Sequence, residues 1–544
     1  MAKTTGNDLV VKSLKDEGVD TVFYLTGGPM VDVASRCIEI GFRSVDVRHE
    51  QAAAMAAHAY SRVLGKPGVC FAASGPGTTN LITGVGNAFL DAVPVVALGG
   101  ASALSQAGMG AFQEMDQIGM FKPITKWSER VMDVRRVPEI INKAFRVATS
   151  GQPGPVYIDL PGDVLYREVD ENQVSFPKMP HSVPRVSGDP DLVKKAIALL
   201  KDAKRPVIVT GTGILWSRAM EELKQFVELS GIPFYTTPQG RGVIEEDHKL
   251  SFLGARNQAW KEADVALFIG TRLNFIVGFG LPPRFAEDVK VIQVDISDEE
   301  IGRNRPVDVG IIGDAKMVLQ QLTKEGRDAF HGRKELAWVD TLRGYEKRAT
   351  EKSQALLNTD QTPIHPLRLC KEVRDFMDRD AIIVVDGHEI LNFARQSIPT
   401  NAPGHRVNAG PNGCMGVAVP FGLGAKVAKP NTQVIVLSGD GSFGMNGMEI
   451  DTMIRHNIPA IIVISNNGGW AGAGVMTAGR DLGYSRYDKM AEVFGAHGEF
   501  VERAQDIRPA LERAVKSGKP AVVNVVTDPS ARSSTVSFAA YRAI

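Results

Sequence analysis

The 544 residues are too many for one ordinary hydrophobic core and predict about three domains of roughly 100 to 200 residues each. The composition, 44% apolar with 55 glycines and 30 prolines, excludes a disordered or fibrous chain. Lysine plus arginine total 62, and so do aspartate plus glutamate, so no net charge attracts nucleic acid or an anionic membrane. We therefore expect a globular protein whose partners are small molecules.

The expected location is the cytoplasm. No apolar stretch reaches about 18 residues, so no membrane-spanning helix is predicted. Residues 1–18 are charged throughout and read as the start of an amphipathic helix, without the apolar core of a signal peptide. The four cysteines show no CxxC spacing, which is typical of buried thiols in a reducing compartment.

The first third of the chain alternates apolar strands, turns rich in glycine, serine, proline and threonine, and helices with a 3.6-residue apolar period. Residues 69–73, 74–79 and 80–90 form one such unit, and another strand is predicted at 155–160. This alternation is typical of a parallel sheet with crossover helices. We predict a first domain over residues 1–180, with a polar, proline-rich linker around 171–190.

Two further α/β domains are predicted, over residues 190–350 and 365–544, with a charged helical stretch at 324–363 between them. The predicted strands are 206–210, 265–269 and 289–294 in the second domain, and 381–385, 433–437, 460–464 and 521–526 in the third. The predicted fold class is α/β, with three doubly wound parallel sheets.

Two polar clusters in the third domain follow successive buried strands: Gly439-Asp440-Gly441 and Asn466-Asn467. One crossover helix fits between them, so both should meet at the carboxyl edge of one sheet. There Asp440, the amide oxygen of Asn467 and a backbone carbonyl near Gly469 would supply hard oxygen ligands for Mg²⁺, and a helix opening at Ser442 would direct N–H groups at a diphosphate. Either cluster alone is explained as well by a tight turn.

This pair of clusters resembles the cofactor signature of the thiamine-diphosphate-dependent enzymes, and the resemblance extends over essentially the whole chain. It implies pyrimidine-binding, central nucleotide-binding-like and diphosphate-binding domains, with active sites at the interface of a homodimer or homotetramer. It also implies that Glu50 faces the aminopyrimidine and helps to generate the thiazolium ylid. The alternative for Glu50 is a first-turn glutamate that stabilises a helix dipole.

Further cofactor contacts follow from the same resemblance. Met415 matches an apolar wedge that bends the cofactor, although core packing would also explain it. The segments SGPGTTN (74–80) and AFQEMDQ (111–117) match loops near the thiazolium, with Phe112 and Gln113 nearest the substrate; an ordinary loop and helix cap are the alternative. The predicted cofactor-binding residues are Gly28, Ser74, Gly75, Asn80, Gly413, Met415, Gly439, Gly441, Ser442, Asn467, Gly469 and Trp470.

The second domain has the elements of a nucleotide pocket. Gly211 and Gly213 follow a strand, but Trp216 replaces the third glycine of a dinucleotide fingerprint, so that motif alone is weak. Together with Arg272 and the strand-end pair Asp295-Ile296, it resembles the pocket in which relatives bind ADP or FAD. An empty, purely structural pocket is the alternative.

The resemblance allows three enzyme activities. AFQEMDQ and SGQPGPVYIDLPGDV suit acetolactate synthase, whereas Asn-Asn-Gly-Gly-Trp at 466–470 is similar to the coenzyme A thioester enzymes oxalyl-CoA decarboxylase and 2-hydroxyacyl-CoA lyase. The chain most resembles the bacterial lyases, especially in TGGPMVDVA, VRHEQAAAMAAHAYSR and NNGGW. Phe112 and Gln113 stand where the decarboxylase has tyrosine and glutamate, which disfavours the decarboxylase. This implies cleavage of a 2-hydroxyacyl-CoA to formyl-CoA and an aldehyde or ketone, or the reverse condensation, with Glu50 and Gln113 as catalytic residues.

The substrate pocket is predicted at the start and end of the third domain. His388 and Glu389 would line the acyl group, although a strand-end turn explains them as well. Arg532, Ser533 and Ser534 would close over the thioester and its phosphates. A non-catalytic homologue is the remaining class, and it would be expected to lack Glu50 or a metal ligand.

Overall fold

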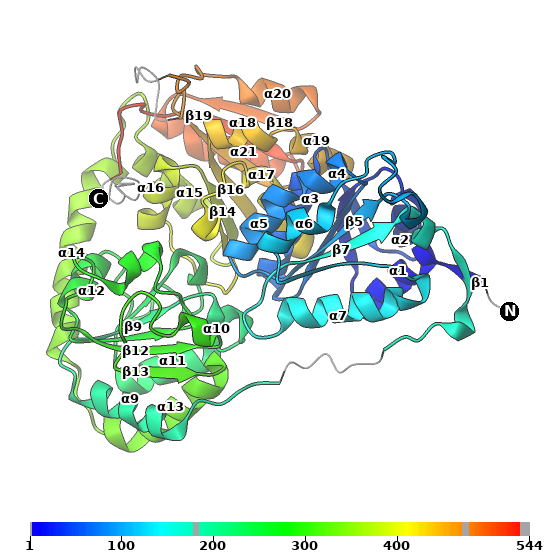
Figure 1. The fold of residues 1–544 in the computed structure, drawn as a ribbon. Helices are drawn as coiled ribbons and strands as arrows, with labels where there is room; N and C mark the ends of the chain where they lie inside the picture. The colour runs from blue at the N-terminus through cyan, green and yellow to red at the C-terminus, as the bar shows by residue number, and fades with distance from the viewer. Residues whose placement is uncertain (1–2, 178–183, 471–477, 534–544) are drawn as a thin grey trace.

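The computed structural model describes residues 3–177, 184–470 and 478–533, and it contains three parallel sheets with helices packed on them (Figure 1). The first sheet lies on the right of that view, the second at lower left and the third at the top. The long helix α14 (Ala337–Leu357) leads from the second region to the third. The prediction of an α/β fold with three parallel-sheet domains is confirmed.

The first sheet has six strands, and its two faces pack into different cores. In sheet order they are β3 (Arg43–Asp46), β2 (Thr21–Leu25), β4 (Gly68–Ala72), β5 (Val95–Ala101), β7 (Val156–Pro161) and β6 (Trp127–Arg130). Val69 and Phe71 pack with α1 (Gly6–Asp16), α2 (Val31–Glu39) and α7 (Val137–Thr149), whereas Cys70 packs with α3 (Glu50–Leu64) and α5 (Ile82–Leu90). The period-2 alternation of strand side chains produces this division.

The third sheet shares a hydrophobic core with the first. Its strands are β15 (Arg406–Val407), β14 (Ile382–Asp386), β16 (Val434–Gly439), β17 (Ile461–Asn466), β19 (Ala521–Val526) and β18 (His497–Val501). The alanine-rich face of α3 packs on α17 (Ala418–Ala428), and a Cβ at Gly424 would lie 2.2 Å from the carbonyl oxygen of Ala56. Small residues therefore let the two helices pack closely and hold the first and third sheets together.

The second sheet has five strands and a core of its own. In order they are β10 (Phe234–Thr236), β9 (Pro206–Thr210), β11 (Val265–Ile269), β12 (Lys290–Asp295) and β13 (Val309–Ile312). The helices α9 (Pro190–Asp202), α11 (Met220–Ser230), α12 (Arg256–Glu262) and α13 (Ala315–Phe330) bury apolar residues in that core. Among the described helices, none is both long and apolar enough to cross a membrane.

Three local expectations are wrong. The predicted amphipathic helix at the N-terminus is present as α1, but it begins only at Gly6, because Lys3–Thr5 form the short strand β1, which pairs antiparallel with β8 (Glu168–Asp170). The charged stretch after the second sheet covers the end of α13 and all of α14, two helices rather than one, and Trp338, Val339 and Leu342 of α14 are buried. Two short helices, α18 (Asp440–Asn446) and α19 (Glu449–Arg455), replace the single crossover helix after β16.

Candidate active site

The two polar clusters of the third domain meet at the carboxyl edge of its sheet. Asp440 follows β16 and Asn467 follows β17, and these strands are parallel neighbours. The side-chain amide of Asn467 lies 2.8 Å from the carbonyl oxygen of Gly469 and 3.1 Å from Oδ1 of Asp440. With its nitrogen facing these two oxygens, the amide donates to both of them. Turned the other way, its oxygen faces them and accepts from the N–H of Gly469, so that three oxygen atoms converge as a bound cation would require.

This convergence fits a divalent cation. Oδ2 of Asp440 is buried and has no hydrogen-bond partner among the described residues, and burial raises the pKa of Asp440 to about 7. A buried acceptor without a donor is costly unless a cation or donor is bound there. A carboxylate, an amide oxygen and a backbone carbonyl are ligands that Mg²⁺ prefers. The described residues contain no cluster of three acidic, histidine or cysteine side chains, so the site depends on amide and carbonyl oxygens.

Neighbouring residues fix the orientation of this cluster. Asn466 is fully buried and its amide donates to the carbonyl of Ser485 and to Asn524 on β19, so the adjacent Asn467 is left to face Asp440. A Cβ at Gly441 would lie 2.7 Å from the ring of Trp470, so only glycine allows the indole to pack there. The helix α18 begins at Asp440 itself, two residues before the predicted start at Ser442.

Asp386 is a site residue that the sequence interpretation missed. It ends β14 beside β16, and its carboxylate accepts hydrogen bonds from the N–H groups of Gly387 and Ala418. Burial raises its pKa to about 6. These bonds tie the end of β14 to the start of α17, next to the half-buried Met415 and near Gly439, while Gly413 is exposed. The signal was available, because Asp386-Gly387 repeats the strand-end Asp-Gly of Asp440-Gly441.

The second cluster lies at the carboxyl edge of the first sheet. Glu50 is the first residue of α3 and is buried, and its Oε2 accepts a 2.9 Å bond from the side chain of Asn80. Ser74 follows β4 and its hydroxyl donates to Oε1 of Gln113 at 2.6 Å and to the carbonyl of Gly28 at 3.1 Å. The structure thus places Gly28, Glu50, Ser74, Asn80 and Gln113 at one sheet edge.

Gln117 holds this edge in place and was not singled out from the sequence. Its side chain accepts from the N–H of Gly75 at 2.8 Å and donates to Asp159 and to the carbonyl of Gly100. Gln113 adopts a left-handed backbone conformation, with φ of 59°. Phe112, beside it, is 85% exposed and contributes nothing to the cluster within one chain. Its predicted proximity to substrate stays a prediction.

The two clusters do not contact each other within one chain. Across the described residues, no hydrogen bond or ion pair joins Glu50 to Asp440, Asn467 or Gly469. Glu50 belongs to the first sheet and the oxygen cluster to the third. A ligand that touches both would have to span two sheet edges.

The start of the C-terminal tail lies against the third sheet. The N–H of Ser533 donates to Oε2 of Glu389 at 2.7 Å, and Nδ1 of His388 lies 3.5 Å from Oε1 of the same carboxylate. Although burial opposes it, bonds from His388 and Ser533 lower the pKa of Glu389 to about 2. The predicted residues His388, Glu389 and Ser533 are therefore together, with Arg532 adjoining; Ser534 and the rest of the tail lie outside the described residues.

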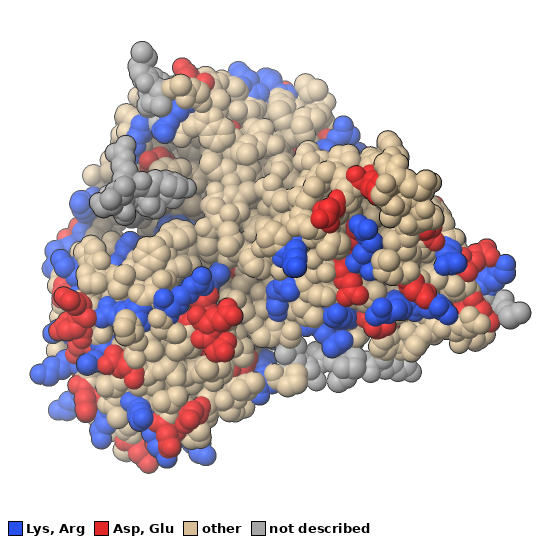
Figure 2. Space-filling view, viewed as in Figure 1, with Lys and Arg blue, Asp and Glu red and all other residues tan. Residues whose placement is uncertain are grey.

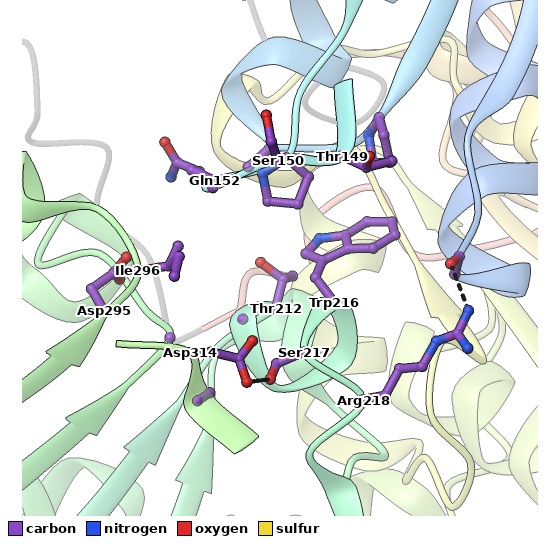
Figure 3. A pocket seen from close by; sticks show the side chains of 18 of the residues that line it. Thr149, Ser150, Gln152, Thr212, Trp216, Ser217, Arg218, Asp295, Ile296 and Asp314 are labelled. Atoms are coloured by element: carbon purple, nitrogen blue, oxygen red, sulfur yellow. Dashed lines mark hydrogen bonds between the residues drawn. The ribbon is translucent and has the colours of Figure 1, made fainter. Parts of the chain in front are cut away.

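A cavity of about 930 Å³ separates the central domain from the first (Figure 3). Gly213, Arg272, Asp295 and Ile296 line it as predicted, whereas Gly211 packs against Gly270 and is not part of the lining. The opposite wall, which the sequence interpretation missed, comes from residues 145–153 of the first domain. Figure 3 shows the indole of Trp216 between Thr212 and the segment that carries Thr149 and Ser150.

Asp295 is the most informative residue of this cavity. It ends β12, is 6% exposed, and burial raises its pKa to about 6. One of its oxygens accepts from the N–H of Ser297 at 3.0 Å. A carboxylate at the end of a parallel strand is where nucleotide-binding sheets hold ribose hydroxyls.

Three protein-family models match this chain, one for each sheet. The thiamine pyrophosphate enzyme N-terminal TPP-binding domain matches residues 4–120, the central domain of the same enzymes matches 193–322, and the C-terminal TPP-binding domain matches 390–525.

Characterised relatives are similar over nearly the full length. A 2-hydroxyacyl-CoA lyase of Arabidopsis thaliana is 36% identical, over 97% of this chain and 96% of its own. An acetolactate synthase large subunit of Mycobacterium tuberculosis is 36% identical over 96% and 95%, and an oxalyl-CoA decarboxylase of Escherichia coli is 35% identical over 97% and 96%. The names of these three relatives denote different reactions, although their sequence identities to this chain are nearly equal.

The oxygen cluster makes a prediction about stability. Asp440→Asn should raise the melting temperature of the cofactor-free protein by about 2–4 °C, because the amide removes a buried charge and can donate to Asn467. The same variant should lose the stabilisation that Mg²⁺ plus thiamine diphosphate gives the parent protein. Differential scanning fluorimetry with and without the two ligands tests both effects. A variant that still responds to Mg²⁺ would contradict the ligand role, and Asp451→Asn is the control.

Asp295 makes a pH-dependent prediction. Its folded-state pKa lies above the unfolded value, so the native state retains its proton and the parent protein loses stability as the pH rises from about 4 to 6. Asp295→Asn should therefore stabilise the protein at pH 7.5, by up to about 3 kcal/mol, and by roughly half as much at pH 5. Urea unfolding at the two pH values measures the difference. If the change in unfolding free energy were the same at both pH values, the pKa of Asp295 would not be raised in the folded protein.

Proposed function

Because this chain belongs to the thiamine pyrophosphate enzyme family, we propose that it is a lyase that cleaves a 2-hydroxyacyl-CoA into formyl-CoA and an aldehyde or ketone, and that also runs the reverse condensation. Membership of the family makes it a thiamine-diphosphate-dependent enzyme. The narrower assignment, to a coenzyme A thioester, rests on arginines between the central and third domains.

Arg256 of α12 and Arg395 of α16 (Glu389–Ser397) are half-buried, and neither guanidinium has a hydrogen-bond or carboxylate partner among the described residues. Burial, together with the nearby Arg241, lowers the pKa of each to about 10; Arg284 also acts on Arg256. Of the arginines gathered here, Arg241 pairs with Glu246, and Arg256 lies over the ring of Trp260. Half-buried guanidinium groups without a carboxylate partner favour a bound anion.

A coenzyme A thioester supplies such an anion, because its phosphates carry several negative charges. Arginine binds phosphate through two parallel hydrogen bonds. Arg395 lies on the helix that begins at Glu389, beside His388, so a substrate held by its phosphates at the arginines would extend toward the third sheet edge. Pyruvate, the alternative substrate of an acetolactate synthase, carries one carboxylate and no phosphate, so it would neutralise one arginine but not both.

The site residues have separate tasks in this proposal. Asp440, Asn467 and the carbonyl of Gly469 hold Mg²⁺ and through it the diphosphate. Thiamine diphosphate, when bound, supplies the carbanion chemistry. Glu50 exchanges a proton with the aminopyrimidine, and Asn80 holds its carboxylate through Oε2. Gln113, held by Ser74, orients the reacting carbonyl, and His388 with Glu389 borders the acyl group.

The proposed assembly is a homodimer or homotetramer with active sites between copies. Within one chain Glu50 and Asp440 do not meet, so a cofactor that contacts both is best held by two copies. Exposed apolar side chains support this, because Met109, Phe112 and Trp470 lie near the two clusters. Figure 2 shows charged residues interspersed over the lower part of the molecule and a largely uncharged area in its upper middle.

The central cavity is proposed to bind ADP, or FAD in its place. Its volume suits a nucleotide, Asp295 would accept from the ribose, and Lys66, Arg146 and Arg272 line the cavity with positive charge that would attract phosphates. This ligand would be structural in the proposed reaction, because the cavity lies away from the two sheet edges that carry Glu50 and Asp440.

A substrate panel tests the reaction. The protein with thiamine diphosphate and Mg²⁺ is incubated separately with 2-hydroxyacyl-CoA esters, oxalyl-CoA and pyruvate, and products are identified by mass. Formyl-CoA plus an aldehyde or ketone is expected from the hydroxyacyl esters. Formation of acetolactate from pyruvate, with no formyl-CoA from any thioester, would contradict the lyase proposal.

The arginines are tested in the same assay. Arg256→Gln should raise KM for the thioester by about 10- to 100-fold, the loss expected for a charge-assisted hydrogen bond, with little change in kcat. Arg508→Gln, an exposed arginine paired with Glu512, is the control.

A further inference from the structure

The connection that leads into Glu50 is held from both ends by helix α19 of the same chain. Arg455 donates to the side chain and carbonyl of Asp46, at the end of β3, and Nε2 of His456 lies 2.7 Å from the other oxygen of that carboxylate. At the opposite end of α19, Glu449 reaches the backbone of Arg48 and His49. Three of the four residues before Glu50, namely Asp46, Arg48 and His49, are therefore bonded to the crossover that joins the two strands bearing the proposed metal ligands.

Glu449 is a buried carboxylate with an unusual set of partners. It is 1% exposed, and Oε1 accepts from the N–H groups of Arg48 and His49, each at 3.1 Å. Oε2 accepts from the N–H of Arg48 at 3.2 Å and from the hydroxyl of Thr452 at 2.6 Å. Every partner is a donor, which suits an ionised carboxylate. All of its hydrogen bonds to this connection are accepted from the backbone N–H groups of Arg48 and His49, directly before Glu50.

A second contact reaches the other side of Glu50. The side chain of Gln51 donates to Oδ1 of Asn446 at 2.9 Å, and the amide of Asn446 donates to the carbonyl of Gly416 at 2.7 Å. Gly416 follows Met415, the predicted wedge. Residues 48, 49 and 51 are thus bonded to α18 and α19, while Glu50 between them is free to bond Asn80.

We propose that Glu449 is a positioning residue for Glu50: by fixing the N–H groups of Arg48 and His49, it sets where the carboxylate of Glu50 stands toward the aminopyrimidine. This inference rests on the proposed role of Glu50. Domain packing alone does not require Glu449, since α3 and α17 share an extensive apolar interface and Asp46 already binds Arg455 and His456. A neutral side chain would fill the same space.

The test compares Glu449→Gln with Asp451→Asn. Asp451 lies on the same helix and pairs with Arg455 and the side chain of Arg48, but not with the backbone before Glu50. Glutamine at 449 keeps the size and one oxygen, so folding should be preserved, and melting temperatures check this. It places an NH₂ group against the N–H of Arg48 at the position of Oε2, while the hydroxyl of Thr452 can turn to accept, so the backbone at Arg48 is displaced.

Two quantities are measured for each variant. Glu449→Gln should lower kcat by about 10- to 100-fold, the effect of a misplaced catalytic group, while KM changes little. Calorimetry in the presence of Mg²⁺ should show that the affinity for thiamine diphosphate, which carries the pyrimidine, falls by about 10-fold. The affinity for inorganic pyrophosphate, which has no pyrimidine, should not change. Asp451→Asn should match the parent protein in both.

A double-mutant cycle with Glu50→Gln decides whether Glu449 acts through Glu50. In the Glu50→Gln background, Glu449→Gln should have no further effect on the affinity for thiamine diphosphate. Additive losses, or an equal loss of pyrophosphate affinity, would overturn the inference and leave Glu449 a structural residue. If Glu50→Gln itself leaves turnover and cofactor affinity unchanged, the proposed function fails as well. If Glu50→Gln abolishes turnover while Glu449→Gln behaves like Asp451→Asn, only the positioning role fails.

Discussion

The contact of Asp440, Asn467 and Gly469 at the ends of β16 and β17 is the constraint on which the site depends. Oδ1 of Asp440 and the carbonyl oxygen of Gly469 both face the side-chain amide of Asn467, whose nitrogen donates to them when no cation is bound and whose oxygen would join them as a ligand of a bound cation. Asn466 is hydrogen-bonded to Asn524 on β19, and Gly441 packs against the ring of Trp470. These contacts fix the ends of β17 and β16 next to each other. The residues proposed as metal ligands are therefore held beside one another within one chain.

The parallel sheets explain how distant residues come together. Each sheet collects the residues that follow its strands at one edge, which brings Glu50, Ser74 and Gln113 to the first sheet and the oxygen cluster to the third. The packing of α3 on α17 then fixes the two edges relative to each other within a chain. Since α3 begins at Glu50, this packing and the contacts of Glu449 control the same side chain from two directions. Stability of the domain interface and placement of the proposed catalytic group are thus linked.

Much of the fold was predictable because central strands are continuous apolar runs. The bounds predicted for β9, β11 and β19 match the structure, and the carboxyl-edge rule correctly brought Asp440 to Asn467. Short edge strands such as β15 and β18 were missed, since two to five half-apolar residues carry no period of their own. Gln117, Arg256 and Glu449 were missed for a different reason. Their importance lies in partners, or in the lack of partners, far away in sequence, and no local pattern records that.

The measurement that tests the account most directly is anomalous X-ray diffraction from crystals grown with Mn²⁺ and thiamine diphosphate. Mn²⁺ takes the same oxygen ligands as Mg²⁺ and gives an anomalous signal. The account predicts one strong peak within about 2.0–2.3 Å of Oδ1 of Asp440, the amide oxygen of Asn467 and the carbonyl of Gly469, with the pyrimidine of that cofactor against Glu50 of another copy. No peak there, with the amide nitrogen of Asn467 turned to donate to Asp440, would contradict it.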